Sequence, residues 1–168
     1  AKTSGTTSGV KLIPITKESM PHHVRTAMLS TLTYVWKTKN THIFGLGKKI
    51  IFLQGSPILE EKNGIKLGRL SGIVDHHVPG YRQKNRLPDM KINSIEVWEE
   101  KVNAIVEQIV TKDVAIMGGI PSWMVGFFET IIAKTGKSVS EVFPNFGLFV
   151  YGGLNYEPYR AKIEGLTE

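Results

Sequence analysis

Apolar residues in this chain follow two different spacings, and the alternation between them predicts an α/β fold. Short, continuously apolar runs are typical of strands buried on both faces, and they occur at 50–53, 114–117 and 148–151. Apolar residues at helical spacing occur at 16–36, 93–109 and 122–135. Because strands alternate with helices, we expect βαβ crossovers and a mostly parallel sheet flanked by helices.

Each expected helix has a start signal and an apolar stripe. Thr16, Asn93 and Ser122 can cap helix N-termini, and Glu96 stands at the capping-box position after Asn93. Gly136 is typical of a helix C-terminus. The expected buried stripes are Val24, Met28, Leu32 and Val35 in the first helix, Trp98, Val102, Ile105 and Ile109 in the second, and Phe127, Phe128, Ile131 and Ile132 in the third.

Turn signals separate these elements. The pair Asn63-Gly64 predicts a two-residue hairpin, because both turn positions need a positive φ. The segment 79–91 is basic and contains prolines, so we expect a long exposed loop there. Ser138 and Glu141 predict a short capped turn, and Asn155 predicts the start of a last helix.

Two glycine pairs follow predicted strands. Ligands of parallel sheets bind at the loops that leave the carboxyl ends of the strands, and these pairs are predicted to lie in such loops. Gly118-Gly119 follows the run 114–117, and Gly152-Gly153 follows the run 148–151. Glycine permits close approach of a ligand to the backbone, although one such pair could equally serve packing. The two pairs together favour a binding site at this edge of the sheet.

The segment near the N-terminus combines glycines, hydroxyls and a lysine. Its residues are Ser4, Gly5, Thr6, Thr7, Ser8, Gly9 and, two positions later, Lys11. Inward-facing N–H groups, rotatable hydroxyl donors and a mobile positive charge are the chemistry of a phosphate-binding loop. The same composition is also typical of a flexible terminal linker. The pattern G-x-x-x-x-G-K-[ST] does not fit, because only three residues separate Gly5 from Gly9.

Composition narrows the class of protein. The chain has 168 residues, of which 41% are hydrophobic, and no cysteine, so we expect one α/β subdomain over 1–168 without disulfide or thiolate chemistry. No apolar run approaches the roughly 18 residues that a membrane span needs, and the polar N-terminus does not resemble a signal peptide. We therefore expect a cytoplasmic protein with no membrane partner.

The net charge of +6 suits an anionic ligand such as ATP, and it also suits nucleic acid. The basic residues are scattered apart from Arg82, Lys84 and Arg86, and no nucleic-acid motif is recognisable, so we predict no nucleic-acid partner. His76 and His77 follow Asp75, but adjacent side chains diverge and no further ligand set follows. We therefore predict no metal site on the chain.

Three stretches resemble known families. Residues 3–9 with Lys11 resemble the phosphate-binding signature of the adenylate-forming superfamily. Residues 119–124, and residues 143–146 leading into 149–159, resemble the Gretchen Hagen auxin-responsive family of acyl-acid amido synthetases, in its microbial form. The resemblance covers nearly the whole chain. It implies the α/β fold of part of the N-terminal domain of an adenylate-forming enzyme.

The resemblance also implies a chemistry. ATP with Mg²⁺ would activate a small-molecule carboxylic acid as an acyl-adenylate, and an amino acid would then take the acyl group. By position, the loop Ser4–Gly9 with Lys11 would hold the phosphates of ATP. Gly152, Gly153 and Leu154 would lie against the adenine. Pro121, Ser122 and Trp123 would form a wall of the acyl pocket, although Trp123 could instead be core and Lys11 a surface lysine. No catalytic residue is assigned.

Family members are several times longer than this chain, so we expect a fragment whose partner is the remainder of its own polypeptide. The superfamily's later tyrosine-to-glutamate motif, its ribose-binding aspartate and its C-terminal lysine have no match before Glu168. We therefore expect that the chain alone does not complete adenylation. Two alternatives stay open: an acyl-CoA ligase of the same superfamily, and a non-catalytic basic binding module.

Overall fold

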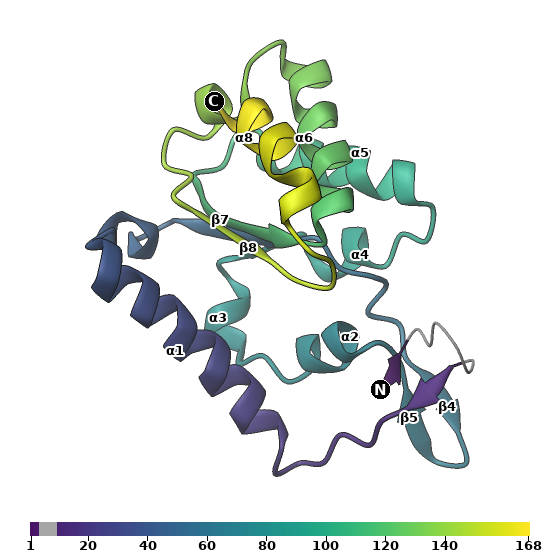
Figure 1. Cartoon of the computed structure of the whole chain (residues 1–168). Coiled ribbons are helices and arrows are strands. Elements are labelled where there is room, and N and C mark those ends of the chain that lie inside the picture. The colour runs from purple at the N-terminus through teal and green to yellow at the C-terminus, as the bar shows by residue number, and fades with distance from the viewer. Residues whose placement is uncertain (4–9) are drawn as a thin grey trace. The chain divides into compact units, whose positions relative to one another are not determined.

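The computed structural model describes residues 1–3 and 10–168, which divide into two compact units (Figure 1). Unit 1 comprises Ala1–Asn40 and Gly55–Gln83, and unit 2 comprises Thr41–Gln54 and Lys84–Glu168. The expected single subdomain over 1–168 stays a prediction.

Unit 2 contains a four-stranded sheet in which every neighbouring pair of strands is parallel. The strands, in their order across the sheet, are β6 (Arg86–Leu87), β3 (Lys49–Phe52), β7 (Val114–Gly119) and β8 (Leu148–Tyr151). The apolar runs therefore form strands as predicted, and the expected α/β class with a parallel sheet is confirmed. Because all neighbours are parallel, crossover connections and not tight hairpins join these strands.

The helices of unit 2 lie before, between and after its strands in the chain. They are η1 (Thr41–Phe44), α4 (Met90–Asn93), α5 (Trp98–Ile109), α6 (Pro121–Thr135), α7 (Val139–Val142), η2 (Glu157–Tyr159) and α8 (Arg160–Thr167). Figure 1 shows α5, α6 and α8 together on one side of β7 and β8. Their apolar stripes and one face of the sheet form the core of this unit.

Two of the predicted apolar helix stripes are confirmed, because their residues are part of the core. Val102, Ile105 and Ile109 of α5 are buried, and Trp98 packs against them. From α6, the residues that pack into the core are Phe127, Phe128, Ile131 and Ile132. Since burying a large apolar side chain stabilises by about 1.5–3 kcal/mol, these two stripes hold the helices to the sheet.

Two predicted helix ends are confirmed in their geometry. α6 ends at Gly136, which has a φ of 68° and whose N–H donates to the carbonyl oxygen of Ile132 at 2.8 Å. Ser138 and Glu141 form a complete capping box at the start of α7. The predicted cap at Asn155 is wrong: its side chain accepts a hydrogen bond from the N–H of Glu157 at 3.2 Å, but η2 begins after Tyr156 and α8 begins after Tyr159.

Two further predicted helix starts are wrong. α5 begins at Trp98, and Asn93 is instead the buried last residue of α4, whose own cap is Asp89. α6 begins at Pro121, one residue before the expected cap Ser122. Proline needs no hydrogen-bond acceptor for its nitrogen and already has a helical φ, so it starts the helix in place of a hydroxyl cap.

The expectation of a long exposed loop over 79–91 is wrong. This segment contains α3 (Gly80–Gln83), the strand β6 and the start of α4. β6 pairs with β3, with Ile50 opposite Arg86 and Ile51 opposite Leu87. A two-residue edge strand with a basic residue carries no apolar run, so its sequence gives no strand signal, and pairing with β3 decides its conformation.

Unit 1 is built from short elements around one long helix. They are β1 (Lys2–Thr3), β2 (Lys11–Leu12), α1 (Met20–Thr38), β4 (Glu60–Lys62), β5 (Ile65–Leu67), α2 (Leu70–Asp75) and α3. β4 and β5 form the predicted hairpin, and Asn63 and Gly64 at its turn have φ values of 52° and 74°. After the hairpin, Leu70–Asp75 form the helix α2, which packs close against the backbone of Ser56 and Pro57 at Gly72.

α1 differs from its prediction at its start and on its face. Thr16 forms a turn with Ser19 through reciprocal hydrogen bonds, and the helix begins at Met20. Met28 and Leu32, expected to be buried, are 39% and 46% exposed. Helical periodicity identifies an apolar face but not what covers it. No helix among the described residues is long and apolar enough to cross a membrane.

Candidate functional site

The loops that leave β7 and β8 emerge next to each other. These strands are parallel neighbours, with Gly118 opposite Val150 and Gly119 opposite Tyr151. The residue after β7, Ile120, approaches the turn after β8, because a Cβ built on Gly153 would lie 3.4 Å from the Cγ1 of Ile120. The structure therefore brings together the turn 152–154 and the first turn of α6, which the sequence had assigned to adenine and to the acyl pocket.

The first glycine pair is part of β7 and serves packing. A Cβ on Gly118 would lie 2.5 Å from the ring of Phe52 and 2.8 Å from the carbonyl oxygen of Val150. A Cβ on Gly119 would lie 3.0 Å from the sulfur of Met124 and 3.1 Å from Leu53. The neighbouring strand β3 and its own following helix thus occupy the space, and this pair forms no turn, contrary to the expectation.

The second glycine pair is open. A Cβ on Gly152 would meet no atom within 4 Å, Gly153 has a φ of 84°, and both residues are exposed. Leu154 after them is 47% exposed. The backbone of this turn is therefore accessible to a ligand, which is what the assigned contact with adenine requires.

Aromatic side chains surround this open turn. The ring of Tyr151 stacks on that of Tyr156, with centroids 4.5 Å apart and an angle of 21° between the planes, and Phe149 contacts both rings. Tyr151 is 51% exposed, so the stack has an accessible end beside the turn. Sequence reasoning did not assign either tyrosine, although both lie in the quoted stretch 149–159.

A charged side chain contacts Tyr156, one of the two stacked rings. The guanidinium carbon of Arg160 lies 5.0 Å from the ring centroid of Tyr156, and Arg160 also pairs with Glu157 at 2.6 Å. Burial raises the pKa of the Tyr156 hydroxyl, and the hydrogen bond from Arg160 lowers the pKa of Glu157. Tyr156 therefore keeps its proton at neutral pH, and its ring orientation is held from both faces.

The predicted acyl-pocket residues have three different environments. Pro121 is buried, Ser122 is exposed, and Trp123 is half-buried against the core. The indole of Trp123 contacts the indole of Trp98, with centroids 4.8 Å apart. Trp98 was expected only as part of a core stripe, and no signal in the sequence connects the two tryptophans.

The predicted phosphate loop, Ser4–Gly9, lies outside the described residues. The residues on either side of it are described: β1 and β2 pair antiparallel, with Thr3 opposite Lys11 and Lys2 opposite Leu12. The Lys2 ammonium pairs with Glu60 at 2.5 Å, and the Lys2 N–H donates to the carbonyl of Gly68 at 2.6 Å. Lys11 is exposed. The strand pair thus brings the two ends of the loop segment to adjacent positions.

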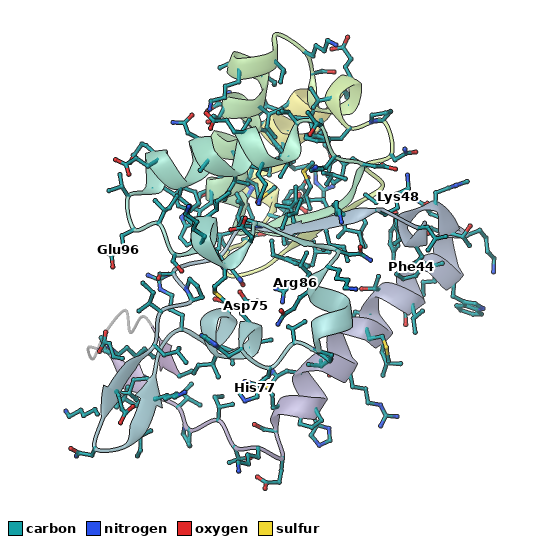
Figure 2. All side chains as sticks on the ribbon, turned by 180° about the vertical axis from the view of Figure 1, so that it is seen from behind. Phe44, Lys48, Asp75, His77, Arg86 and Glu96 are labelled. Atoms are coloured by element: carbon teal, nitrogen blue, oxygen red, sulfur yellow. The ribbon has the colours of Figure 1, made fainter. Side chains whose placement is uncertain are left out.

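The opposite, amino edge of the sheet in unit 2 is held by polar contacts. Lys48, labelled in Figure 2, pairs with Asp113 at 2.6 Å, and Asn145 donates to the same carboxylate at 3.1 Å. These residues precede β3, β7 and β8 respectively. The hydrogen bond from Lys48 holds the pKa of Asp113 below its ordinary value. Side-chain contacts thus connect the starts of three strands at this edge, whereas the accessible turn lies at the carboxyl edge.

The adjacent histidines of unit 1 contact backbone. A ring nitrogen of His76 lies 3.1 Å from the carbonyl oxygen of Pro57, and one of His77 (Figure 2) lies 2.9 Å from that of Ile73. Over residues 1–3 and 10–168, no group of three or more His, Cys, Asp or Glu side chains could hold a metal ion. His22 and His23 on α1 are exposed.

Comparison with known proteins gives one finding. A family model described as the GH3 family N-terminal domain matches residues 1–79. No curated protein and no solved structure matches the chain. The matched residues include the loop 4–9, Lys11 and α1, whereas the sheet of unit 2 lies largely outside them.

Proposed function

We propose that this chain is part of an ATP-dependent acyl-acid amido synthetase of the GH3 family, because the model of the GH3 N-terminal domain matches its residues 1–79. In the proposed reaction, a carboxylate oxygen attacks the α-phosphorus of ATP, forming an acyl-adenylate and releasing pyrophosphate. The amine of an amino acid then attacks the acyl carbon, which forms the amide and releases AMP and a proton. Such a reaction depends mainly on positioning and charge stabilisation.

The observation that carries the proposal is the GH3 match, because it includes the glycine and hydroxyl loop. Ser4, Thr6, Thr7 and Ser8 would donate hydrogen bonds to phosphate oxygens, and the backbone at Gly5 and Gly9 would approach them closely. The exposed ammonium of Lys11 would add positive charge next to the loop. The antiparallel pairing of β1 and β2 supports this role, because it holds Lys11 opposite Thr3 at the loop's other end.

The carboxyl edge of the sheet supports the remaining assignments. The open turn Gly152–Leu154 would contact the adenine through its backbone, and the neighbouring first turn of α6, Pro121–Trp123, would contact the acyl part of the acid. Both assigned groups lie at the same edge of the sheet, which supports the binding of one acyl-adenylate molecule, in which the ribose and a phosphate join the adenine to the acyl group.

In the proposed reaction, Mg²⁺ would bind to the phosphates of ATP as their counter-ion. The described residues offer no set of three carboxylate or imidazole ligands. No step of the reaction is therefore derived through a metal that the protein itself holds.

Titration calorimetry with ATP and Mg²⁺ tests the nucleotide site. We expect saturable binding that the double substitution Ser4→Ala/Thr6→Ala weakens by at least about tenfold, because hydrogen bonds to charged groups contribute about 1.5–3 kcal/mol each. The matched control is Ser30→Ala/Thr33→Ala, which removes two exposed hydroxyls from α1 and should leave the affinity unchanged. Equal binding by the two double variants would contradict the assignment of the loop.

A second titration separates the amido synthetase from the acyl-CoA ligase. The acceptor of an acyl-CoA ligase is a thiol, so saturable binding of CoA after ATP and a carboxylic acid are present would favour that enzyme. We expect no such binding.

A further inference from the structure

We propose that Trp98 determines which acid the acyl site accepts, by forming with Trp123 an aromatic wall that selects a carboxylic acid with an apolar body. This inference rests on the proposed function, since it refines the acyl site of that enzyme. It adds to the acyl site a residue from a second helix.

The two indoles are in direct contact. Their ring centroids lie 4.8 Å apart and their planes are tilted by 45°. Both side chains are half-buried, so each has one part against the core and one part that is accessible. An aromatic pair of this geometry contributes about 0.5–1.5 kcal/mol beyond the area that it buries, so each ring supports the position of the other.

The topology places this pair at the ligand-binding edge of the sheet. α6 begins two residues after β7 ends, so its first turn, with Trp123, stands at the carboxyl edge. α5 runs in the chain toward the amino end of β7, so the first turn of α5, with Trp98, stands at the carboxyl edge as well. The contact between the rings agrees with this placement. The turn Gly152–Leu154 leaves the neighbouring strand at the same edge.

A buried lysine fixes the first turn of α5. Lys101, one turn after Trp98, is 3% exposed, and its ammonium donates to the carbonyl oxygens of Asn93 at 2.6 Å and Gln54 at 3.0 Å. Gln54 follows β3 at the carboxyl edge. The ammonium of Lys101 thus connects the start of α5 with the residues that follow β3. Trp98 is held in place by this anchor, and a fixed ring can discriminate between substrates better than a mobile one.

The chemistry of the wall defines the acid. An indole face gives a flat apolar surface that packs against aromatic rings and alkyl chains. A second carboxylate placed against it would lose hydration without gaining a partner, which is costly. The acid therefore carries one carboxylate, which reacts with ATP, and an aromatic or alkyl body, which contacts the two tryptophans.

The tryptophan content of the chain permits a direct test. The chain has three tryptophans, and the third, Trp36, is 71% exposed on α1. In a Trp36→Phe background, the indole fluorescence reports only on Trp98 and Trp123. The probes are 2-naphthoate and decanoate, with succinate as the polar control, each titrated with the full chain by fluorescence and by calorimetry.

We expect a saturable fluorescence change with 2-naphthoate and decanoate but not with succinate. Trp98→Leu should weaken the calorimetric affinity for 2-naphthoate about tenfold, while Trp98→Phe, which keeps a ring, should weaken it less. Val97→Ala is the matched control, because Val97 precedes Trp98 and is 50% exposed, and it should bind like the parent. Thermal unfolding of each variant checks that it is folded.

Three results would overturn the inference: no saturable signal with either apolar acid, equal binding of succinate, or unchanged affinity in Trp98→Leu. ATP titrations of the same variants report separately on the proposed function, and ATP affinity should not depend on Trp98. If the parent chain binds apolar acids selectively but does not bind ATP, the proposed function is contradicted and the aromatic wall is not.

Discussion

Gly152 and Gly153 are neighbours in the sequence but differ in what they require of the backbone. Gly153 has a φ of 84°, which side-chain-bearing residues rarely adopt, whereas no such φ occurs at Gly152. The sequence shows two equivalent glycines. The structure shows that only the second one needs to be glycine for the turn, and that the first is open to a ligand.

This difference predicts different stabilities for two matched variants. Gly153→Ala should lower the free energy of unfolding by about 1 kcal/mol, because a residue with a Cβ is strained in the left-handed region. Gly152→Ala is the control and should change it by less than about 0.5 kcal/mol, since its Cβ would meet no atom within 4 Å. Urea unfolding measures both values. Equal destabilisation by the two substitutions would show that the turn has another conformation.

At the scale of elements, Asp113 links the starts of three strands. Its carboxylate pairs with Lys48 before β3 and accepts a hydrogen bond from Asn145 before β8. The hydrogen bond from Lys48 lowers the pKa of Asp113, partial burial opposes this, and Asn145 assists it. Because the pKa is lower in the folded state than in the unfolded chain, this carboxylate stabilises the fold above its unfolded pKa and loses that contribution as the pH falls through its folded pKa.

The predicted outcome is a pH-dependent difference between variants. Asp113→Asn should unfold at a lower temperature than the parent at pH 7, and this difference should shrink as the pH is lowered from about 4 toward 2. Thermal unfolding followed by circular dichroism measures it. Glu96→Gln is the control, since Glu96 (Figure 2) is an exposed carboxylate before α5, and its difference from the parent should stay small at every pH. A difference for Asp113→Asn that does not change with pH would exclude the charge as its cause.

The elements with strong local signals were predictable. The strands β3, β7 and β8, the hairpin at Asn63-Gly64 and the capping box at Ser138 each follow from residues a few positions apart. The expected burial on both faces is wrong for β8, because Val150 and Tyr151 are exposed. β6 and the start of α5 were not predictable, because Arg86-Leu87 has no strand pattern and because Asn93, a residue type that suits a helix cap, is instead the last residue of α4. In these cases, pairing and packing with distant residues decide the structure.

At the scale of the whole molecule, the charge is divided unevenly between the two units. Unit 1 has 10 Lys and Arg residues against 4 Asp and Glu, whereas unit 2 has 11 of each. The net charge of +6 therefore belongs to the unit that contains the segment of the proposed phosphate loop. Such a field attracts an anion and weakens as salt screens it.

Salt should therefore weaken the binding of ATP. Between 50 and 300 mM NaCl at constant Mg²⁺, we expect the affinity to fall by about threefold to tenfold, measured by calorimetry. Adenosine is the control ligand, because it lacks phosphates, and its affinity should change little. Equal salt dependence of ATP and adenosine would contradict the proposed role of the charge, and tight, steeply salt-dependent binding of DNA or RNA would favour the alternative basic module.

The sequence by itself determined the α/β class, the positions of three strands, several turns and the family resemblance, because each depends on the pattern of neighbouring residues or on short motifs. Only the tertiary structure decided which glycines pack and which stay accessible, since Gly118 is covered by Phe52 whereas Gly152 is open. It also decided that Trp98 contacts Trp123 and that Lys101 anchors α5. Contacts between residues far apart in the chain depend on how helices and strands pack, and no local pattern encodes that packing.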